Sequence, residues 1–184
     1  MGFDLHGRGP FSTNEPKYPK SDDFEKREKY FEEMQKFEKA NPGCYFRNNV
    51  WWWRPLWEFI CDVAAKNVLT LEDAERGCYN DNWLIGKTKA KRIAKNIYKL
   101  HEMGAIEKYK EEREKFLGKL PEVECNICDG SGYRNMDDSN VSTVCNACKG
   151  KGKRADFDTN YPFDVENVID FAIFCEHSGG FRIG

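Results

Sequence analysis

The sequence predicts a mainly α protein with a few short strands, organised around a small α+β helical domain. Most of the chain shows apolar residues at helical spacing, separated by polar turns. Short strand-like segments bounded by Gly lie near both ends. A doubled Cys-rich motif stands apart from both patterns. With 184 residues, the chain is long enough for one domain with a small satellite.

The composition of the chain argues against two classes of partner, nucleic acid and membrane. The net charge of -2 gives no overall attraction to nucleic acid or to an anionic membrane, so sequence-specific nucleic acid is not an expected partner. No apolar run approaches the roughly 20 residues that span a bilayer, and we expect no membrane partner. The N-terminus lacks the basic start and apolar stretch of a signal peptide, and we expect a cytoplasmic location. Oligomeric state is left open.

The expected organisation has five parts. Residues 1–10 form a strand and a Gly-rich turn packed on the main domain. Residues 11–43 are a charged helical insertion, and residues 44–120 form the helical main domain. Residues 121–154 carry the Cys-rich motif. Residues 155–184 contain a last helix that returns to the main domain.

The first elements follow from local signals. Phe3–Leu5 is expected as a strand. A helix is expected in the segment 21–43, opened by a capping box of Asp22 and Glu25 and ended by Asn-Pro-Gly at 41–43. Its apolar stripe is sparse, which predicts a surface helix; the stripe comprises Phe24, Phe31, Met34 and Phe37.

The segment YFRNNVWWWRPLW, residues 45–57, contains four of the five Trp residues. Pro55 favours the first turn of a helix, because its missing N–H costs nothing there. The residue before a Pro is biased toward extended geometry, so Val50–Trp53 is expected as strand or turn, with Trp51 and Trp53 on one side and Trp52 on the other. The following helix would bury one face, made of Leu56, Phe59, Ile60, Val63 and Ala64.

Three further helical regions follow. Thr70 with Asp73 opens a helix over 70–78. Residues 85–104 and 105–116 are both expected to be helical. The buried stripe of the former comprises Ala90, Ile93, Ile97 and Leu100, with Lys87, Lys91, Lys95 and Lys99 facing outward. The lysine row is read as a solvated face, although a part in ligand binding is left open. The last helix, within 163–179, uses Val165, Val168, Ile169, Ala172 and Ile173, and Phe181–Ile183 is expected as a short strand.

The Cys-rich motif is the strongest functional signal. CNICDGSG at 125–132 is echoed by CNACKGKG at 145–152, so both halves are CxxCxGxG. Two such halves bring four thiolates together, which is the ligand set of a closed tetrahedral Zn²⁺ site. We therefore expect one structural zinc ion, held by Cys125, Cys128, Cys145 and Cys148. This completes the predicted fold class: a small α+β helical domain plus a zinc-stapled β-hairpin segment.

The doubled motif resembles the cysteine-rich zinc domain of DnaJ-type (Hsp40) co-chaperones over about 30 residues. DnaJ proteins carry four repeats and two zinc ions, whereas this chain has two repeats. It also lacks the His-Pro-Asp tripeptide of a J-domain, so the resemblance implies the zinc fold and not chaperone activity.

The aromatic and basic segment predicts a binding surface. Guanidinium and amide donors beside indole rings suit stacked bases and phosphates, and they suit protein hot spots equally. A purely structural role for the Trp residues is the alternative. The candidate ligand-binding residues are Arg47, Asn48, Asn49, Trp51, Trp52, Trp53 and Arg54, with Asp4, His6 and Arg8 from the N-terminal turn.

A second resemblance concerns MGFDL at 1–5, YFRNN at 45–49, WWWRPL at 51–56 and SGGF at 178–181. Together they resemble a group of small bacteriophage-encoded proteins, mostly of unknown function. The resemblance implies phage origin, and hence action in a host-cell cytoplasm. By analogy with small phage accessory proteins, it favours a binder of a host enzyme or of a host-defence nucleotide signal over an enzyme.

Three functions are therefore expected in order of preference. The first is a non-enzymatic accessory protein, a host-defence antagonist that binds or sequesters an anionic, nucleotide-like ligand. The second is an inhibitor or adaptor that docks on a host protein through its aromatic patch. The third is a small hydrolase or transferase that uses Asp4 and His6, which would share a face of an extended strand.

Overall fold

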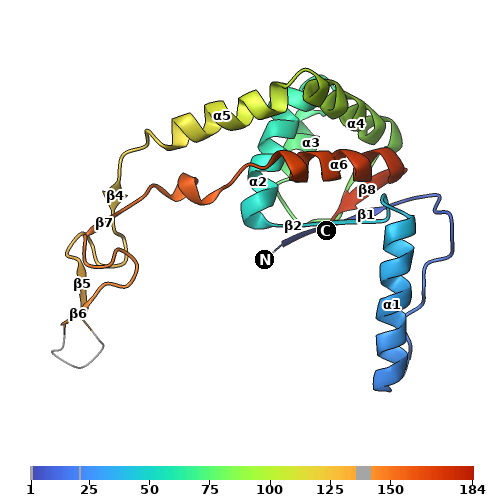
Figure 1. Ribbon diagram of the computed structural model, residues 1–184, viewed down its shortest axis with the longest axis horizontal. Coiled ribbons are helices and arrows are strands. Elements are labelled where there is room, and N and C mark those ends of the chain that lie inside the picture. The colour runs from blue at the N-terminus through green and yellow to red at the C-terminus, as the bar shows by residue number, and fades with distance from the viewer. Residues whose placement is uncertain (1, 21, 136–141) are drawn as a thin grey trace. The chain divides into compact units, whose positions relative to one another are not determined.

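The computed structural model describes residues 2–20, 22–135 and 142–184. The chain divides into two compact units. The first, unit 1, comprises the residues up to Lys110 together with Phe163–Gly184, and the second, unit 2, comprises Glu111–Pro162. The predicted class is confirmed, because the described chain is mainly helical with small antiparallel sheets (Figure 1).

A four-stranded antiparallel sheet organises unit 1. Its strands are β1 (Gly2–Gly7), β2 (Tyr45–Asn49), β3 (Trp83–Gly86) and β8 (Gly180–Ile183), in the order β2-β1-β8-β3. The expected strands at both ends of the chain are thus confirmed, and they pair with each other. β3 was not predicted: Ile85, expected to begin a helix, instead lies in β3 opposite Phe181.

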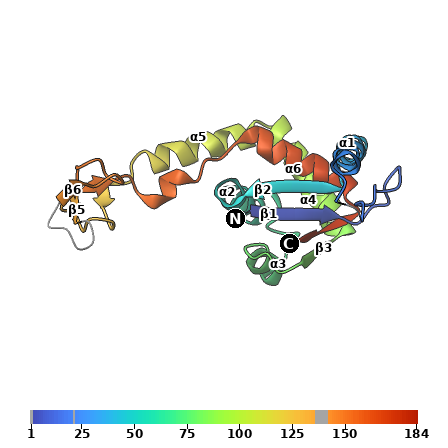
Figure 2. The ribbon, with the colours of Figure 1, turned by 90° about the horizontal axis from the view of Figure 1, so that it is seen from below.

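Helices cover one face of this sheet. The chain forms α1 (Phe24–Ala40), α2 (Val50–Phe59), α3 (Leu71–Arg76), α4 (Lys87–Glu102), α5 (Ala105–Leu117) and α6 (Val165–His177), with a π-helical turn at Ile60–Ala64 and a 3₁₀ turn at Phe157–Asn160. Figures 1 and 2 show α2, α4 and α6 on the same side of the strands. The opposite side, which we call the outer face, is therefore available for polar side chains.

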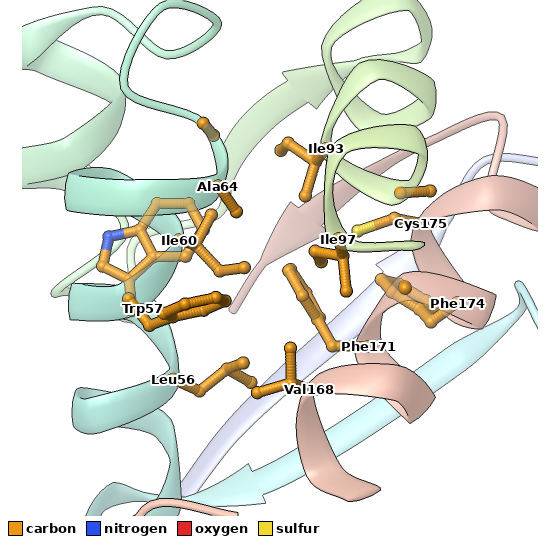
Figure 3. Close-up of a cluster of buried hydrophobic side chains, with 14 of the residues drawn as sticks. Leu56, Trp57, Ile60, Ala64, Ile93, Ile97, Val168, Phe171, Phe174 and Cys175 are labelled. Carbon is orange, nitrogen blue, oxygen red and sulfur yellow. The ribbon is translucent and has the colours of Figure 1, made fainter. Parts of the chain in front are cut away.

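The core lies between the sheet and these three helices. Figure 3 shows four of these side chains pointing toward one another. Trp57 and Ile60 come from α2 and its π-helical extension, Ile97 comes from α4, and Phe171 comes from α6. Their side chains are almost wholly buried. The predicted stripe of α4 is confirmed for Ala90, Ile93 and Ile97. Each buried aromatic ring removes a large apolar area from water, and this burial stabilises a domain of such small size.

The start of α2 corrects the expectation for Val50–Trp53. These residues are helical. The Asn49 side chain accepts hydrogen bonds from the backbone N–H groups of Trp51 and Trp52 at 3.0 and 3.2 Å, so the helix is capped there and begins about one turn before the start expected from Pro55. Pro55 consequently lies inside the helix rather than in its first turn. Val63, expected in the buried stripe, is 41% exposed, and Trp57 takes the inward position.

The insertion helix α1 also differs in detail. Its cap is Asp23, which accepts from the Glu25 backbone N–H at 3.1 Å, while the expected cap Asp22 pairs with Arg27. Phe37 is buried, whereas Phe24 and Phe31 are exposed, so the helix is attached to unit 1 mainly through its C-terminal end. The residue Ser21, in the predicted helical segment, lies outside the described residues.

Asp73 ties three elements together. The predicted capping box with Thr70 is present, and the buried carboxylate also accepts from the Trp83 indole at 3.1 Å and pairs with Lys89. Burial by itself raises the pKa of this carboxyl, but the hydrogen bonds from Lys89, Thr70 and Trp83 outweigh it and hold the pKa below its ordinary value of 3.8.

Asp73→Asn is therefore expected to lower the free energy of unfolding by about 2 kcal/mol at neutral pH, because Lys89 loses its charged acceptor. The native pKa is depressed, so the stabilisation is present above pH 3.8 and is lost as the pH falls through the native value. Denaturant unfolding at several pH values measures both effects. An unchanged acid dependence in the variant would contradict this assignment.

Candidate metal centre and candidate ligand surface

The two CxxCxGxG halves form paired knuckles in unit 2. Cys125 follows β4 (Val123–Glu124), and β7 (Lys153–Arg154) follows the second knuckle and pairs with β4. The first Cys of each knuckle donates its backbone N–H to the last Gly of the other: Cys125 to the Gly152 carbonyl at 2.9 Å, and Cys145 to the Gly132 carbonyl at 2.8 Å. The sequence repeat is therefore also a structural repeat, with near two-fold exchange of hydrogen bonds.

The four sulfurs fit a tetrahedral metal ion. Cys125, Cys128, Cys145 and Cys148 are all buried, and their sulfurs lie within 4.8 Å of one another. Two of the separations are 3.9 Å (Cys125–Cys145) and 3.7 Å (Cys128–Cys148). A Zn²⁺ ion with four Zn–S bonds of about 2.3 Å requires sulfurs about 3.8 Å apart. The predicted quartet can thus hold a metal ion.

Backbone N–H groups prepare the thiols for metal. Gly132 and Gly152 donate their N–H groups to the sulfurs of Cys128 and Cys148 at 3.2 and 3.3 Å. Such bonds stabilise thiolate charge around a bound ion. Hydrogen bonds from the Cys148 and Ala147 backbone, which outweigh burial, lower the pKa of the Cys145 thiol to about 7. Burial raises the pKa of the neighbouring Cys128 thiol to about 11, so a bound cation is needed to hold all four sulfurs as thiolates at neutral pH.

Glycine is required where the knuckles meet. Gly132 and Gly152 have φ of 78° and 70°, and a Cβ at either position would lie 2.4 or 2.1 Å from a carbonyl oxygen of the opposite knuckle. β5 (Tyr133–Asn135) and β6 (Ser142–Val144) pair beyond the knuckles, which confirms the expected hairpin; its tip, 136–141, lies outside the described residues.

The predicted Trp/Arg cluster is divided by the fold. Trp53 and Trp57 are core residues, whereas Trp51 and Trp52 are 39% and 36% exposed on the first turn of α2. Arg47 lies on the outer face in β2, one element away from Arg54 in α2. These side chains therefore do not form one site.

Several predicted ligand contacts have structural roles. Asn48 is buried and donates to the Asn167 side chain at 3.0 Å, which ties β2 to α6. Asn49 caps α2. The Arg8 backbone N–H donates to the carbonyls of Ser178 and Gly180 at 2.7 and 2.9 Å, which joins the N-terminal turn to β8, while its side chain is exposed.

The outer face of the sheet brings the remaining candidates together. β1 buries Phe3 and Leu5, so Asp4 and His6 project to the other side. The register opposes Asp4 to Arg47 and His6 to Tyr45 on β2, and His6 to Arg182 on β8. We call these five residues the outer-face cluster: Asp4, His6, Tyr45, Arg47 and Arg182.

Contacts among the side chains of the outer-face cluster hold several of them in place. The Tyr45 hydroxyl donates to Asp4, and the Arg47 guanidinium lies 3.5 Å from the same carboxylate. The rings of His6 and Tyr45 are 5.3 Å apart. Burial and the neighbouring Asp4 raise the pKa of Tyr45 to about 12, so the phenol stays protonated as a donor. Tyr45 and Arg47 thus both engage the Asp4 carboxylate, whereas the Arg182 guanidinium donates to the Asn82 carbonyl at 2.9 Å.

A hollow of about 450 Å³ adjoins this cluster at His6 and Tyr45. We call it the α1 hollow, because α1 supplies one wall. Its aromatic lining comprises Phe11, Tyr30, Phe31 and Phe37 in addition to Tyr45 and His6. Glu15 and Glu38 line it as well. Sequence reasoning did not place Tyr45, Arg182 or the α1 rings in a site, because only strand register and the packing of α1 bring them to His6.

Comparison of the chain with protein-family models, with curated proteins and with solved structures finds no match. The class of protein is therefore defined by its own fold and site: a mainly α protein with a four-Cys centre that can hold a metal ion. Among the described residues, no helix combines the length and apolar character needed to cross a membrane.

Proposed function

We propose that this protein is a non-enzymatic binding protein, stabilised by one structural zinc ion, whose outer face holds an anionic, nucleotide-like ligand. The observation that carries the proposal is the register of β1, β2 and β8, which places Arg47 and Arg182 on the same face as His6 and Tyr45, two residues that line an aromatic hollow. The resemblance to phage accessory proteins supports a role in sequestering a host-defence signal.

The parts of such a ligand match different parts of the surface. Arg47 and Arg182 lie on the two strands that flank β1. Their guanidinium N–H groups that are not directed at Asp4 and at the Asn82 carbonyl are the donors for phosphate oxygens. The aromatic walls of the α1 hollow suit stacking of a base. Glu15 and Glu38 disfavour phosphate inside the hollow and can accept from base N–H groups, as acidic side chains do from cytosine. The phosphate is therefore expected over the strands.

Arg47→Ala is expected to weaken nucleotide binding by about tenfold or more, because a charge-assisted hydrogen bond to phosphate is lost. Isothermal titration calorimetry against a panel of mono-, di- and cyclic nucleotides measures it. Arg54→Ala is the matched control: it removes another candidate guanidinium, from a separate part of unit 1, and should leave affinity unchanged.

Absence of binding by every panel member would overturn the proposal. Equal loss in the Arg54 and Arg47 variants would also contradict the placement on the outer face.

The four-Cys centre is proposed to be structural rather than catalytic. Four thiolates close the coordination of zinc and leave no position for substrate. Among the described residues of unit 2, Tyr161 is the one buried hydrophobic residue besides these Cys, so a bound ion replaces the core that unit 2 lacks. Zinc is favoured because soft thiolates in tetrahedral geometry select it.

A second candidate function rests on the exposed indoles of Trp51 and Trp52, which lie side by side in sequence on the first turn of α2. Exposed Trp residues are typical hot spots of protein interfaces. If the protein is instead an inhibitor of a host protein, Trp52→Ala should abolish a stoichiometric complex that Arg47→Ala leaves intact.

The enzymatic alternative retains Asp4 and His6 on one face, as predicted. Asp4 is already engaged by Tyr45 and Arg47, which favours a positioning contact over proton transfer. Turnover of any substrate that survives His6→Ala would exclude this pair as its acid and base.

A further inference from the structure

The polar side chains of the α1 hollow are mainly hydrogen-bond acceptors. Its volume of about 450 Å³ lies within the usual range for small-molecule sites. The described residues that line it include no Lys, Arg, Asn, Gln, Ser or Thr, whereas Glu15 and Glu38 both belong to the lining. The Tyr45 hydroxyl, also in the lining, already donates to Asp4. A ligand inside the hollow therefore has to supply mainly donors.

The two carboxylates have no partner of their own. Neither Glu15 nor Glu38 makes a hydrogen bond or an ion pair with the residues that the structure describes. Glu38 is partly buried on α1, and Glu15 is exposed in the connector formed by residues 11–20. Burial and then the charges of Glu38 and Glu15 raise the pKa of the Cys44 thiol, so both carboxylates act on the same lining residue. A donor-bearing ligand would satisfy both.

The connector that carries Glu15 is attached to α1 on both sides of this residue. On one side, the Asn41 side chain accepts from the Ser12 backbone N–H at 2.7 Å and from the Ser12 hydroxyl at 2.8 Å. On the other side, the ring of Tyr18 packs edge-on against Tyr30 of α1, with centroids 5.1 Å apart. The wall of the hollow that bears Glu15 is therefore assembled before any ligand arrives, which lowers the cost of binding.

Phe31 offers free ring surface inside the α1 hollow. Its side chain is 56% exposed although it belongs to the lining, and an edge contact with Tyr30 at 5.5 Å orients it. Phe37, by contrast, is buried. Stacking on an aromatic ring is tolerant of the base that stacks, because every base has a π-face. The rings thus explain why a base binds, and the carboxylates decide which base.

The donor pattern of guanine matches a carboxylate best among the common bases. Guanine presents its N1–H and its 2-amino group side by side on the Watson–Crick edge, and the two oxygens of one carboxylate can accept both. Adenine and cytosine place a ring-nitrogen acceptor beside the amino group, and uracil places a carbonyl on each side of its one N–H. Such an acceptor repels the second oxygen of the carboxylate.

We propose that the base of the outer-face ligand is guanine, stacked on Phe31, with its N1–H and 2-amino group donated to Glu38 and the second amino hydrogen to Glu15. This inference rests on the proposed function, because it names the base of the ligand proposed there. His6 and Tyr45 belong both to the hollow and to the outer-face cluster. The sugar therefore passes over these two residues, and the phosphate stays over the strands.

Titration calorimetry of the full-length protein with GMP, IMP and AMP tests the proposal. IMP differs from GMP only by lacking the 2-amino group. GMP is expected to bind at least about tenfold more tightly than either IMP or AMP, because a hydrogen bond to a charged acceptor is lost in both. Glu38→Gln is expected to weaken GMP binding by about tenfold and to bring the affinities for GMP and IMP close together.

Glu32→Gln is the matched control, because Glu32 is an exposed acid of α1 outside the lining. It should leave the preference for GMP unchanged. Equal affinities for the three nucleotides, each weakened by Arg47→Ala, would overturn the guanine assignment and leave the proposed function standing. A preference for GMP that persists in folded Glu38→Gln protein would overturn it as well. If no nucleotide of the wider panel binds, the proposed function and the guanine assignment both fail.

Discussion

Removal of zinc, by chelation or by Cys148→Ser, is expected to unfold unit 2 while the core of unit 1 stays folded. The four Cys and Tyr161 are the buried hydrophobic residues in the described part of unit 2, so little remains to offset its chain entropy. Structural zinc in small domains contributes about 10–16 kcal/mol of apparent binding free energy at neutral pH. Few single changes elsewhere approach that effect.

Elemental analysis should give one zinc per chain for the purified protein and none for Cys148→Ser. Amide spectra should lose the dispersed signals of residues 121–135 and 142–154 on chelation and regain them when zinc is restored. Cys78→Ser is the control, because Cys78 is an exposed thiol outside the quartet. A metal-free protein with unchanged spectra would show that the knuckles hold themselves together without an ion.

The same centre should release its ion as the pH falls. Metal binding requires four thiolates, so protons compete with the ion for the sulfurs as the pH falls. A bound cation depresses thiol pKa values, so protons displace zinc only at clearly acidic pH.

Trp53→Ala is expected to lower the free energy of unfolding of unit 1 by about 3–5 kcal/mol. Its indole is fully buried, stacks on Phe3 and Trp57 at 5.2 Å each, and donates its N–H to the Gly77 carbonyl at 2.9 Å. The change leaves a large cavity and removes the hydrogen-bond partner of a buried carbonyl. It also disconnects the three segments that meet at this ring.

Trp52→Ala gives the matched comparison from the neighbouring position. Its ring is 36% exposed, and surface changes of this kind usually alter stability by about 0.5 kcal/mol or less. Denaturant unfolding followed by far-ultraviolet circular dichroism measures both variants. Similar losses for the two would contradict the division of the Trp cluster into core and surface.

Local signals were sufficient for much of the fold. The Thr70–Asp73 capping box, the stripe of α4 and the α6 helix were predicted because each depends on residues within one or two turns. The knuckles were predicted for the same reason: four Cys side chains and two Gly-rich turns are encoded within 28 residues of chain, from 125 to 152.

Competing local signals produced the errors. Asn49 is a strong cap and Pro55 a strong start signal, and they favour different first residues for the same helix. In the structure the helix begins after the Asn49 cap, because the Asn49 side chain accepts hydrogen bonds from two backbone N–H groups. Pro55 inside the helix forgoes only the single backbone hydrogen bond that its missing N–H would have donated. β3 was missed because a four-residue strand next to a helix has no period of its own; its partner, β8, is about 100 residues away.

The sequence by itself determined the metal quartet, the main helices and the identity of the polar groups available for binding. Only the tertiary structure decided which of four neighbouring indoles enter the core, and which cations share a surface. Arg47 meets Asp4 through the pairing of strands about 40 residues apart, while Arg54 lines a different hollow on α2. Side-chain direction in a strand or helix depends on register and cap position, and both are set by non-local packing that no short stretch of sequence contains.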